Sequence, residues 1–173
     1  MIAAPLVSLL SFHVGSSRVA LPLRMVREVM DHPTIVPVPG SLSHVAGVAL
    51  KGGVAIPAYD LERFGALWRH QEGVGQMAGT ERWSHLILCE FGEVLLGLLG
   101  EQVDLTDGLA DTQGEDDDGG CEMLGDYVSG LLRSGTERVA LLDPVKLFPS
   151  LGVPADGSGS AREDGGEEDP AGR

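Results

Sequence analysis

Two aspartates occupy matching places in this chain and are its best candidates for carboxylate chemistry. Asp60 and Asp143 each follow an apolar run and precede a short segment that ends in phenylalanine. A carboxylate in such a place can act as a general acid or base, and it can also cap the helix that follows. We favour capping, because the sequence contains no Walker lysine loop and no G-x-S-x-G motif. The sequence therefore predicts no enzyme, and no residue is assigned a catalytic role.

The other residue types that bind metals do not cluster. The five histidines show no His-x-x-x-His spacing and the two cysteines no Cys-x-x-Cys spacing, so no zinc site is expected. We expect each histidine to lie at the surface or to be partly buried. Residues 111–122 resemble a calcium-binding loop in part, but Asp116 stands where that loop requires glycine. The sequence predicts no metal site and no cofactor.

A lysine stands where a hairpin turn is expected. Lys51-Gly52-Gly53 separates two apolar runs, and glycines suit a tight turn between strands. A lone cation at such a tip is well placed to meet the carboxylate of a partner protein. A lysine that only keeps the turn soluble fits the pattern equally well, and the sequence leaves both interpretations open.

The segments that carry these residues are duplicated. Asp60 follows Val45-Ala46-Gly47 at the same spacing at which Asp143 follows Val128-Ser129-Gly130. Upstream of the first copy lie Phe12–Gly15, Val19–Leu23 and Val26, and upstream of the second lie the similar Leu88–Gly92, Val94–Leu98 and Val103. Two similar half-units predict a pseudo-twofold, all-β module.

Short apolar runs between glycine-rich turns predict the strands. They are Leu6–Val14, Arg18–Leu23, Val45–Leu50, Val54–Tyr59, Ser84–Phe91, Val94–Leu99, Tyr127–Leu132 and Arg138–Leu142. Helices are expected after Asp60 and Asp143, and Pro22 is expected to open a short helical stretch in which Val26, Val29 and Met30 share one face. Residues 104–122 are expected to form a long acidic loop. Many short strands favour small barrels or a sandwich.

Acidity is concentrated in two segments. The formal charge is −14, but residues 104–126 hold nine acidic residues and no Lys or Arg, and residues 154–173 hold six acidic residues against two arginines. The rest is nearly neutral and has no basic stripe, which argues against a nucleic-acid partner. Residues 154–173 contain almost nothing apolar, so we expect a disordered acidic tail. Two cysteines and the absence of a secretory signal pattern favour the cytoplasm.

The order of the motifs resembles the CheW-like family of chemotaxis coupling proteins. The match runs through Phe12-x-Val-Gly, Val19-Ala-Leu-Pro-Leu, Val26-Arg-Glu28-Val29, Val45-Ala-Gly47-Val48, Ala49-Leu50-Lys51-Gly52, Ile56-Pro57-Ala-Tyr-Asp60-Leu61 and Val139-Ala-Leu-Leu-Asp143. The resemblance covers residues 5 to 151 and implies one domain. It implies two pseudo-symmetric, five-stranded, SH3-like β-barrels that share a hydrophobic core, with few short helices.

The resemblance also implies a function. Such adaptors bind the regulatory domain of a CheA-type histidine kinase and the cytoplasmic hairpin tip of a chemoreceptor, a methyl-accepting chemotaxis protein, and are recruited to membrane-associated receptor arrays. By motif match, Val26, Glu28 and Lys51 would line the receptor groove, with Gly52 and Gly53 supporting the hairpin tip. The kinase-facing surface would use apolar positions on the first subdomain that the match does not assign one by one.

Three departures from the family pattern leave alternatives open. Ala49 and Lys51 replace the family's Asn and Arg, so bidentate pairing with a carboxylate is lost at residue 51 while the charge remains. Gly100 stands for the family's usual Asp, and the acidic loop is long. A second hypothesis is therefore an array filler or competitor that binds the kinase or other CheW-like domains but not the receptor. A third is a small-molecule or metal-binding enzyme that uses Asp60, Asp143 or the acidic loop.

Overall fold

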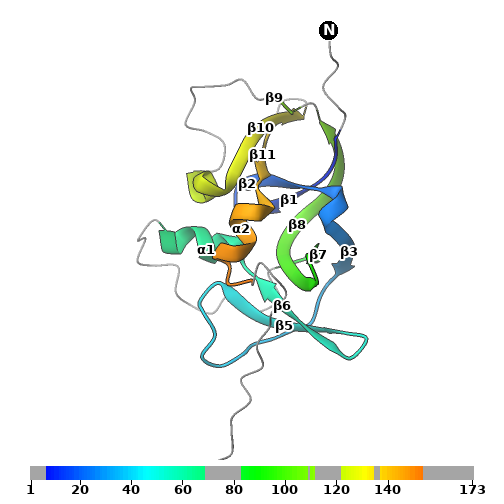
Figure 1. Cartoon of the computed structure of the whole chain (residues 1–173), viewed down its shortest axis with the longest axis vertical. Helices are drawn as coiled ribbons and strands as arrows, with labels where there is room; N and C mark the ends of the chain where they lie inside the picture. The colour runs from blue at the N-terminus through cyan, green and yellow to red at the C-terminus, as the bar shows by residue number, and fades with distance from the viewer. Residues whose placement is uncertain (1–6, 69–82, 109, 112–121, 135–136, 154–173) are drawn as a thin grey trace, which may run out of the picture.

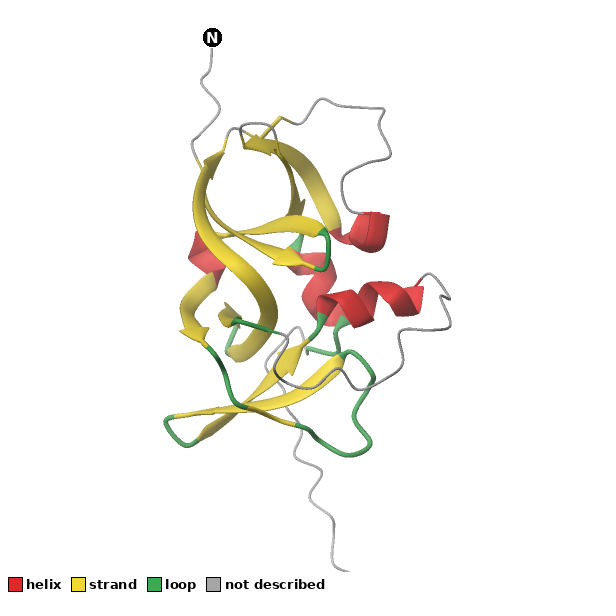
Figure 2. Ribbon diagram, turned by 180° about the vertical axis from the view of Figure 1, so that it is seen from behind, coloured by secondary structure: helices red, strands yellow, loops and turns green. Residues whose placement is uncertain are grey.

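The computed structural model describes residues 7–68, 83–108, 110–111, 122–134 and 137–153. Most of this part is β-strand, and its two α-helices lie between an upper and a lower group of strands (Figure 1). The same arrangement is visible from the opposite side (Figure 2).

The strands alternate with short turns along the chain. The first half of the sequence forms β1 (Val7–Val14), β2 (Ser17–Pro22), β3 (Val26–Asp31), β4 (Ile35–Val36), β5 (Val45–Lys51) and β6 (Val54–Tyr59). The second half forms β7 (His85–Phe91), β8 (Val94–Gly108), β9 (Ala110–Asp111), β10 (Val128–Ser134) and β11 (Glu137–Leu142). Helices α1 (Leu61–Trp68) and α2 (Pro144–Ser150) follow β6 and β11, and 3-10 turns are η1 (Leu23–Met25) and η3 (Glu122–Tyr127).

The long strand β8 belongs to two sheets. Its residues 94–100 pair with β7, and its residues 101–108 pair with β1. Sheet I has the order β3-β7-β8-β6-β5-β4, and sheet II has the order β8-β1-β2-β11-β10-β9. Each sheet has five longer strands and one edge strand of two residues, and the backbone pairing recorded for the described residues closes neither sheet into a ring. The expected all-β fold with few short helices is confirmed, with open sheets in place of closed barrels.

The two halves of the sequence exchange strands between the sheets. In sheet I, β6 of the first half pairs in parallel with β8 of the second half, with Ala58 opposite Gly97. In sheet II, β11 of the second half pairs in parallel with β2 of the first half, with Leu141 opposite Ala20. Each sheet is therefore completed by strands from the other half of the chain.

Local details confirm the internal repeat. The β5–β6 hairpin has an irregular register between Val45 and Gly47, and the β10–β11 hairpin has the same irregularity between Val128 and Gly130. Leu141 and Ala58 occupy matching places, two residues before Asp143 and Asp60, and their parallel partners are Ala20 and Gly97. The structure therefore matches Ala20 with Gly97, whereas the motif comparison in the sequence matches Ala20 with Leu95. The expected alignment of Val19–Leu23 with Val94–Leu98 is therefore displaced by two residues.

The copies differ in how the chain crosses from one sheet to the other. In the first copy Pro22 ends β2, and turn η1 then leads into β3 in sheet I. In the second copy β8 crosses without interruption, and Gln102, at the corresponding place, adopts a φ of 47°. A positive φ is uncommon for a residue other than glycine, and the register of β8 against β1 is irregular at this point.

The main core lies between the sheets. It contains Phe12, Leu21, Ile87, Leu98 and Phe148, among other buried side chains that come from both sheets and from α2. Sheet I encloses a second cluster around Ile56 and Leu86, and sheet II encloses a smaller third cluster around Leu9 and Val139. This arrangement agrees with the expected shared core between two similar units.

Two expectations about local structure are wrong. Residues 26–31 form strand β3, not a continuation of a helix from Pro22, because Val26, Val29 and Met30 pair with β7. The expected acidic loop begins too early, since Asp104 and Thr106 are strand residues opposite Ser11 and Leu9. The alternation of apolar Val103 and Leu105 with polar neighbours was the signal for this strand.

Several expectations fall outside the described residues. They include the expected tail 154–173, residues 112–121 of the expected acidic loop, and residues 5 and 6 of the expected domain. Among the helices that the structure does describe, none has the length and apolar character needed to cross a bilayer.

Candidate partner-binding site

The β5–β6 hairpin holds Lys51 at its tip. Lys51 pairs with Val54, and the two residues between them, Gly52 and Gly53, have φ angles of 56° and 83°. Positive φ at both central residues defines the tight turn that best fits the twist of a hairpin, and glycine adopts it without strain. The two glycines therefore fix the position of Lys51 at the end of the strand.

Lys51 forms an ion pair with Glu28 of β3. The two side chains are 39% and 50% exposed, so water screens their attraction and the pair contributes at most about 1 kcal/mol to stability. In the pairing recorded for the described chain, β3 bonds to β7 and β5 bonds to β4 and β6, so the ion pair joins strands that share no backbone ladder. It bridges the open side of sheet I with groups that a partner can reach.

Val26 lies close to Glu28 in sequence but on the other face of the sheet. The register of β3 against β7 shifts between Val26, which is opposite Cys89, and Glu28, which is opposite Leu88. Cross-strand partners share a face, so Val26 packs against the main core while Glu28 points toward Lys51. Of the three residues expected in a receptor groove, the structure brings Glu28 and Lys51 into contact and leaves Val26 half-buried beside them.

Two of the other departures from the family pattern, Ala49 and Gly100, lie in the interior. Ala49 is buried opposite Ile56, so it supplies packing. A Cβ on Gly100 would lie 2.6 Å from Cδ2 of Phe12, which leaves no room for an aspartate. The next residue, Glu101, is exposed and carries a carboxylate at this place in the chain.

The outer face of sheet I is apolar and uncovered in the described chain. Val36 and Val48 pair across β4 and β5, and Leu50 lies on the same face of β5 as Val48. Leu50 is 64% exposed and Val36 is 49% exposed. These residues were not assigned to a partner-binding surface from the sequence.

The candidate carboxylates act as helix caps. Oδ1 of Asp60 accepts hydrogen bonds from the backbone N–H groups of Glu62 at 2.9 Å and Arg63 at 3.2 Å. Oδ1 of Asp143 likewise accepts from Val145 at 3.0 Å and Lys146 at 3.4 Å. Asp60 also forms an ion pair with Arg63, with 3.2 Å between Oδ2 and Nε. The predicted capping of the following helices by both aspartates is confirmed by these contacts.

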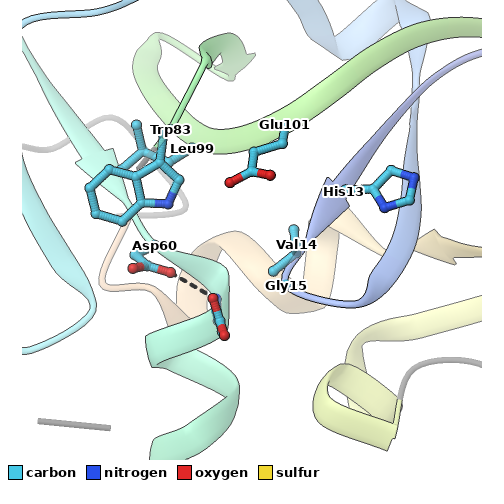
Figure 3. Close-up of a pocket in the computed structure, with 8 residues that line it drawn as sticks. His13, Val14, Gly15, Asp60, Trp83, Leu99 and Glu101 are labelled. Carbon is cyan, nitrogen blue, oxygen red and sulfur yellow. Dashed lines mark hydrogen bonds between the residues drawn. The ribbon is translucent and has the colours of Figure 1, made fainter. Parts of the chain in front are cut away.

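A small cavity lies beside Asp60 (Figure 3). Its volume is about 10 Å³, which is room for about one water molecule. It is lined by His13, Val14, Gly15, Asp60, Glu62, Trp83, Leu99 and Glu101. Within the described residues no group of three or more His, Cys, Asp or Glu side chains could hold a metal ion.

Two other reactive residue types are buried. Burial raises the pKa of the Cys89 thiol to about 12, so it stays protonated and is a poor nucleophile. His44 is only 5% exposed, and its ring stacks on Tyr59 and contacts Phe64 edge-on. The expectation that each histidine is exposed or partly buried is therefore wrong for His44, whose ring fills a gap between aromatic side chains.

Comparison with known proteins identifies the family. The model of the CheW-like domain matches residues 8–151. Among solved structures, the scaffolding protein TtCheW from Thermoanaerobacter tengcongensis matches with a TM-score of 0.59 and 15% sequence identity, covering 80% of this chain and 84% of that one. Comparison with curated proteins finds no match. Because the family model spans most of the sequence, the chain belongs to the CheW-like domain family.

Proposed function

We propose that this protein is a non-enzymatic chemosensory scaffold that couples chemoreceptors to a CheA-type histidine kinase. Membership of the CheW-like family supports the scaffold role. The observation that carries the receptor half is the exposed Lys51–Glu28 pair at a turn fixed by two glycines. A carboxylate on a receptor helical hairpin can exchange with Glu28 for Lys51 at little cost, because both groups remain partly in water.

The outer face of sheet I supports the kinase half of the proposal. Val36, Val48 and Leu50 form an apolar surface next to the hairpin that carries Lys51. Exposed aliphatic side chains gathered on one sheet face are typical of protein-binding surfaces. The receptor and kinase surfaces thus share strand β5, which is the physical connection that a coupling protein needs. The domain would span residues 5–151 and work in the cytoplasm at membrane-associated receptor arrays.

Charge reversal at Lys51 tests receptor binding. Lys51→Glu should weaken binding to a purified receptor hairpin at least tenfold in calorimetry, because a carboxylate then meets a carboxylate. Lys146→Glu makes the same change at an exposed position of α2, and this variant should bind the receptor hairpin normally. The double variant Glu28→Lys, Lys51→Glu restores the internal ion pair with its polarity reversed. If it binds the receptor as well as the parent does, Lys51 acts only within the fold.

A second pair of variants tests kinase binding. Leu50→Arg should weaken binding to the regulatory domain of the kinase, because it puts a charge into a desolvated contact. Leu105→Arg is the matched control, since Leu105 is 73% exposed but lies on sheet II. Equal kinase binding by both variants would remove the outer face of sheet I from the interface.

The same measurements separate the filler hypothesis from the coupling hypothesis. The replacement of the family's Arg by Lys51 is the observation that favours a filler. A chain that binds the kinase domain but not the receptor hairpin would act as an array filler or competitor. Binding of both partners by one chain at the same time supports coupling.

A further inference from the structure

A second cation stands beside the Lys51–Glu28 pair. Arg27 lies between Val26 and Glu28, at the point where the register of β3 against β7 shifts. Such a bulge places one extra residue in a strand and changes the direction of its side chain, and bulges are common beside binding sites. The irregular register therefore presents Arg27 at the surface between two residues of the candidate site.

Arg27 is held by a carboxylate of the neighbouring strand. Its Nη1 lies 3.1 Å from Oε2 of Glu90 in β7, and the two side chains are 65% and 43% exposed. An ion pair this open to water is weak and exchanges readily. The guanidinium also has five N–H donors, so one contact with Glu90 leaves donors available for another acceptor.

The two ion pairs at this end of sheet I have the same construction. Lys51 is held by Glu28, and Arg27 by Glu90, so each exposed cation pairs with a carboxylate from a different strand. Glu28 is opposite Leu88 of β7, and Glu90 lies two residues from Leu88 on the same face of that strand, so both pairs lie on one face of sheet I. An acidic partner that reaches Lys51 thus meets a guanidinium nearby.

We propose that Arg27 is a second contact for a carboxylate of the receptor helical hairpin, and that Glu90 pairs with Arg27 when no partner is bound. This inference rests on the proposed receptor binding. It assigns to Arg27 the bidentate carboxylate pairing that a lysine at position 51 does not provide. The partner is then a helical hairpin with two carboxylates spaced to reach both cations.

Removing the competing carboxylate is the sharpest test. Glu90→Gln releases Arg27 without changing the cation, so it should strengthen binding of the receptor hairpin about threefold to tenfold at low salt. Arg27→Gln should weaken it by a similar factor, and Arg27→Lys should recover only part of the loss. Arg133→Gln removes the charge of an exposed arginine on sheet II and should leave binding unchanged.

The outcomes separate this inference from the proposed function. If Lys51→Glu weakens binding while Glu90→Gln and Arg27→Gln leave it unchanged, Arg27 is not a contact and the receptor site stands. If the parent protein does not bind a receptor hairpin, receptor coupling and this inference are both overturned. Binding of the kinase domain should be the same for all Arg27 and Glu90 variants, and a loss there would show that the substitutions disturb the fold.

Discussion

Gly47 of β5 lies directly against the backbone carbonyl of Val36. A Cβ at residue 47 would be 2.2 Å from that carbonyl oxygen, and Gly47 has a φ of 150°. The strand β4 reaches this position only because residue 47 has no side chain. The corresponding glycine of the second copy, Gly130, has no atom within 4 Å of such a Cβ. The same residue type thus meets different requirements in the two copies.

Alanine substitutions should reveal this difference. Gly47→Ala should lower the free energy of unfolding by at least about 2 kcal/mol, because backbone atoms must move apart. Gly130→Ala should change it by less than about 1 kcal/mol and can stabilise the protein by restricting the unfolded chain. Urea unfolding followed by circular dichroism measures both. Equal effects would mean that β4 moves away from β5 without cost.

The two capping aspartates should contribute unequally. Asp143→Ala should cost about 1 kcal/mol, as expected for a partly exposed cap. Asp60→Ala should cost more, because the Asp60 side chain is 2% exposed and its loss also removes the carboxylate that pairs with Arg63. The variants Asp60→Asn and Asp143→Asn keep a capping oxygen and serve as controls. Thermal unfolding that ranks Asp143→Ala as the more damaging change would contradict this assignment.

The buried thiol should make stability depend on alkaline pH. Burial raises the pKa of Cys89 from 9.0 to about 12, so above pH 9 the unfolded chain loses this proton and the folded chain keeps it. The contribution of Cys89 to stability is complete below pH 9 and declines as the pH rises toward 12. Between pH 8 and pH 10.5 the free energy of unfolding should fall by about 1–2 kcal/mol less for a Cys89→Ala variant than for the parent. Burial also raises the pKa of Tyr59, so the comparison is made with Tyr59 present in both proteins.

Thiol labelling provides an independent check on Cys89. In a Cys121→Ser variant, a thiol reagent should react with Cys89 only after addition of denaturant. Rapid reaction in native buffer would show that the strand pair β7–β8 opens.

The ring of His44 should stabilise the carboxyl-terminal part of the domain. Its Nε2 lies 3.3 Å from the carbonyl oxygen of Leu151, just after α2. His44→Phe keeps the aromatic packing but leaves that carbonyl without the contact, so it should cost about 1 kcal/mol. His32→Asn changes an exposed histidine whose φ of 44° asparagine also tolerates, and is the control. An unchanged melting temperature for His44→Phe would show that packing alone matters there.

Local pattern predicted most of the hairpins but not how they assemble. Alternation and glycine turns located β5–β6 and β10–β11, and the aspartate spacing predicted both caps. The helix expected at Val26–Met30 is wrong because an i, i+3, i+4 pattern also arises in a strand whose register shifts, as at Arg27. The length of β8 was missed because its second part, which includes Asp104 and Asp107, pairs with β1 on one side and is an edge of sheet II. Acidic residues are tolerated in an edge strand, and in the sequence they resemble a loop. The parallel pairs connect residues far apart in sequence and leave no local signal.

The contacts around the candidate partner site were predicted only in part, for a related reason. The motif match named Glu28 and Lys51, and the structure joins them. It could not reveal that Val26 faces the other way, or that Arg27 shares the surface, since both depend on one register shift. Leu50 was overlooked because a single strand's alternation does not show which face neighbouring elements cover.

The exchange of β2 and β8 between the sheets means that neither copy of the repeat is a complete folding unit. Each copy alone would present strands whose parallel partners belong to the other copy. The topology is that of an intertwined dimer whose two subunits are joined into one chain. Two separately expressed pieces, divided between residues 68 and 83, should thus remain unfolded alone and recover the native circular dichroism spectrum only when mixed.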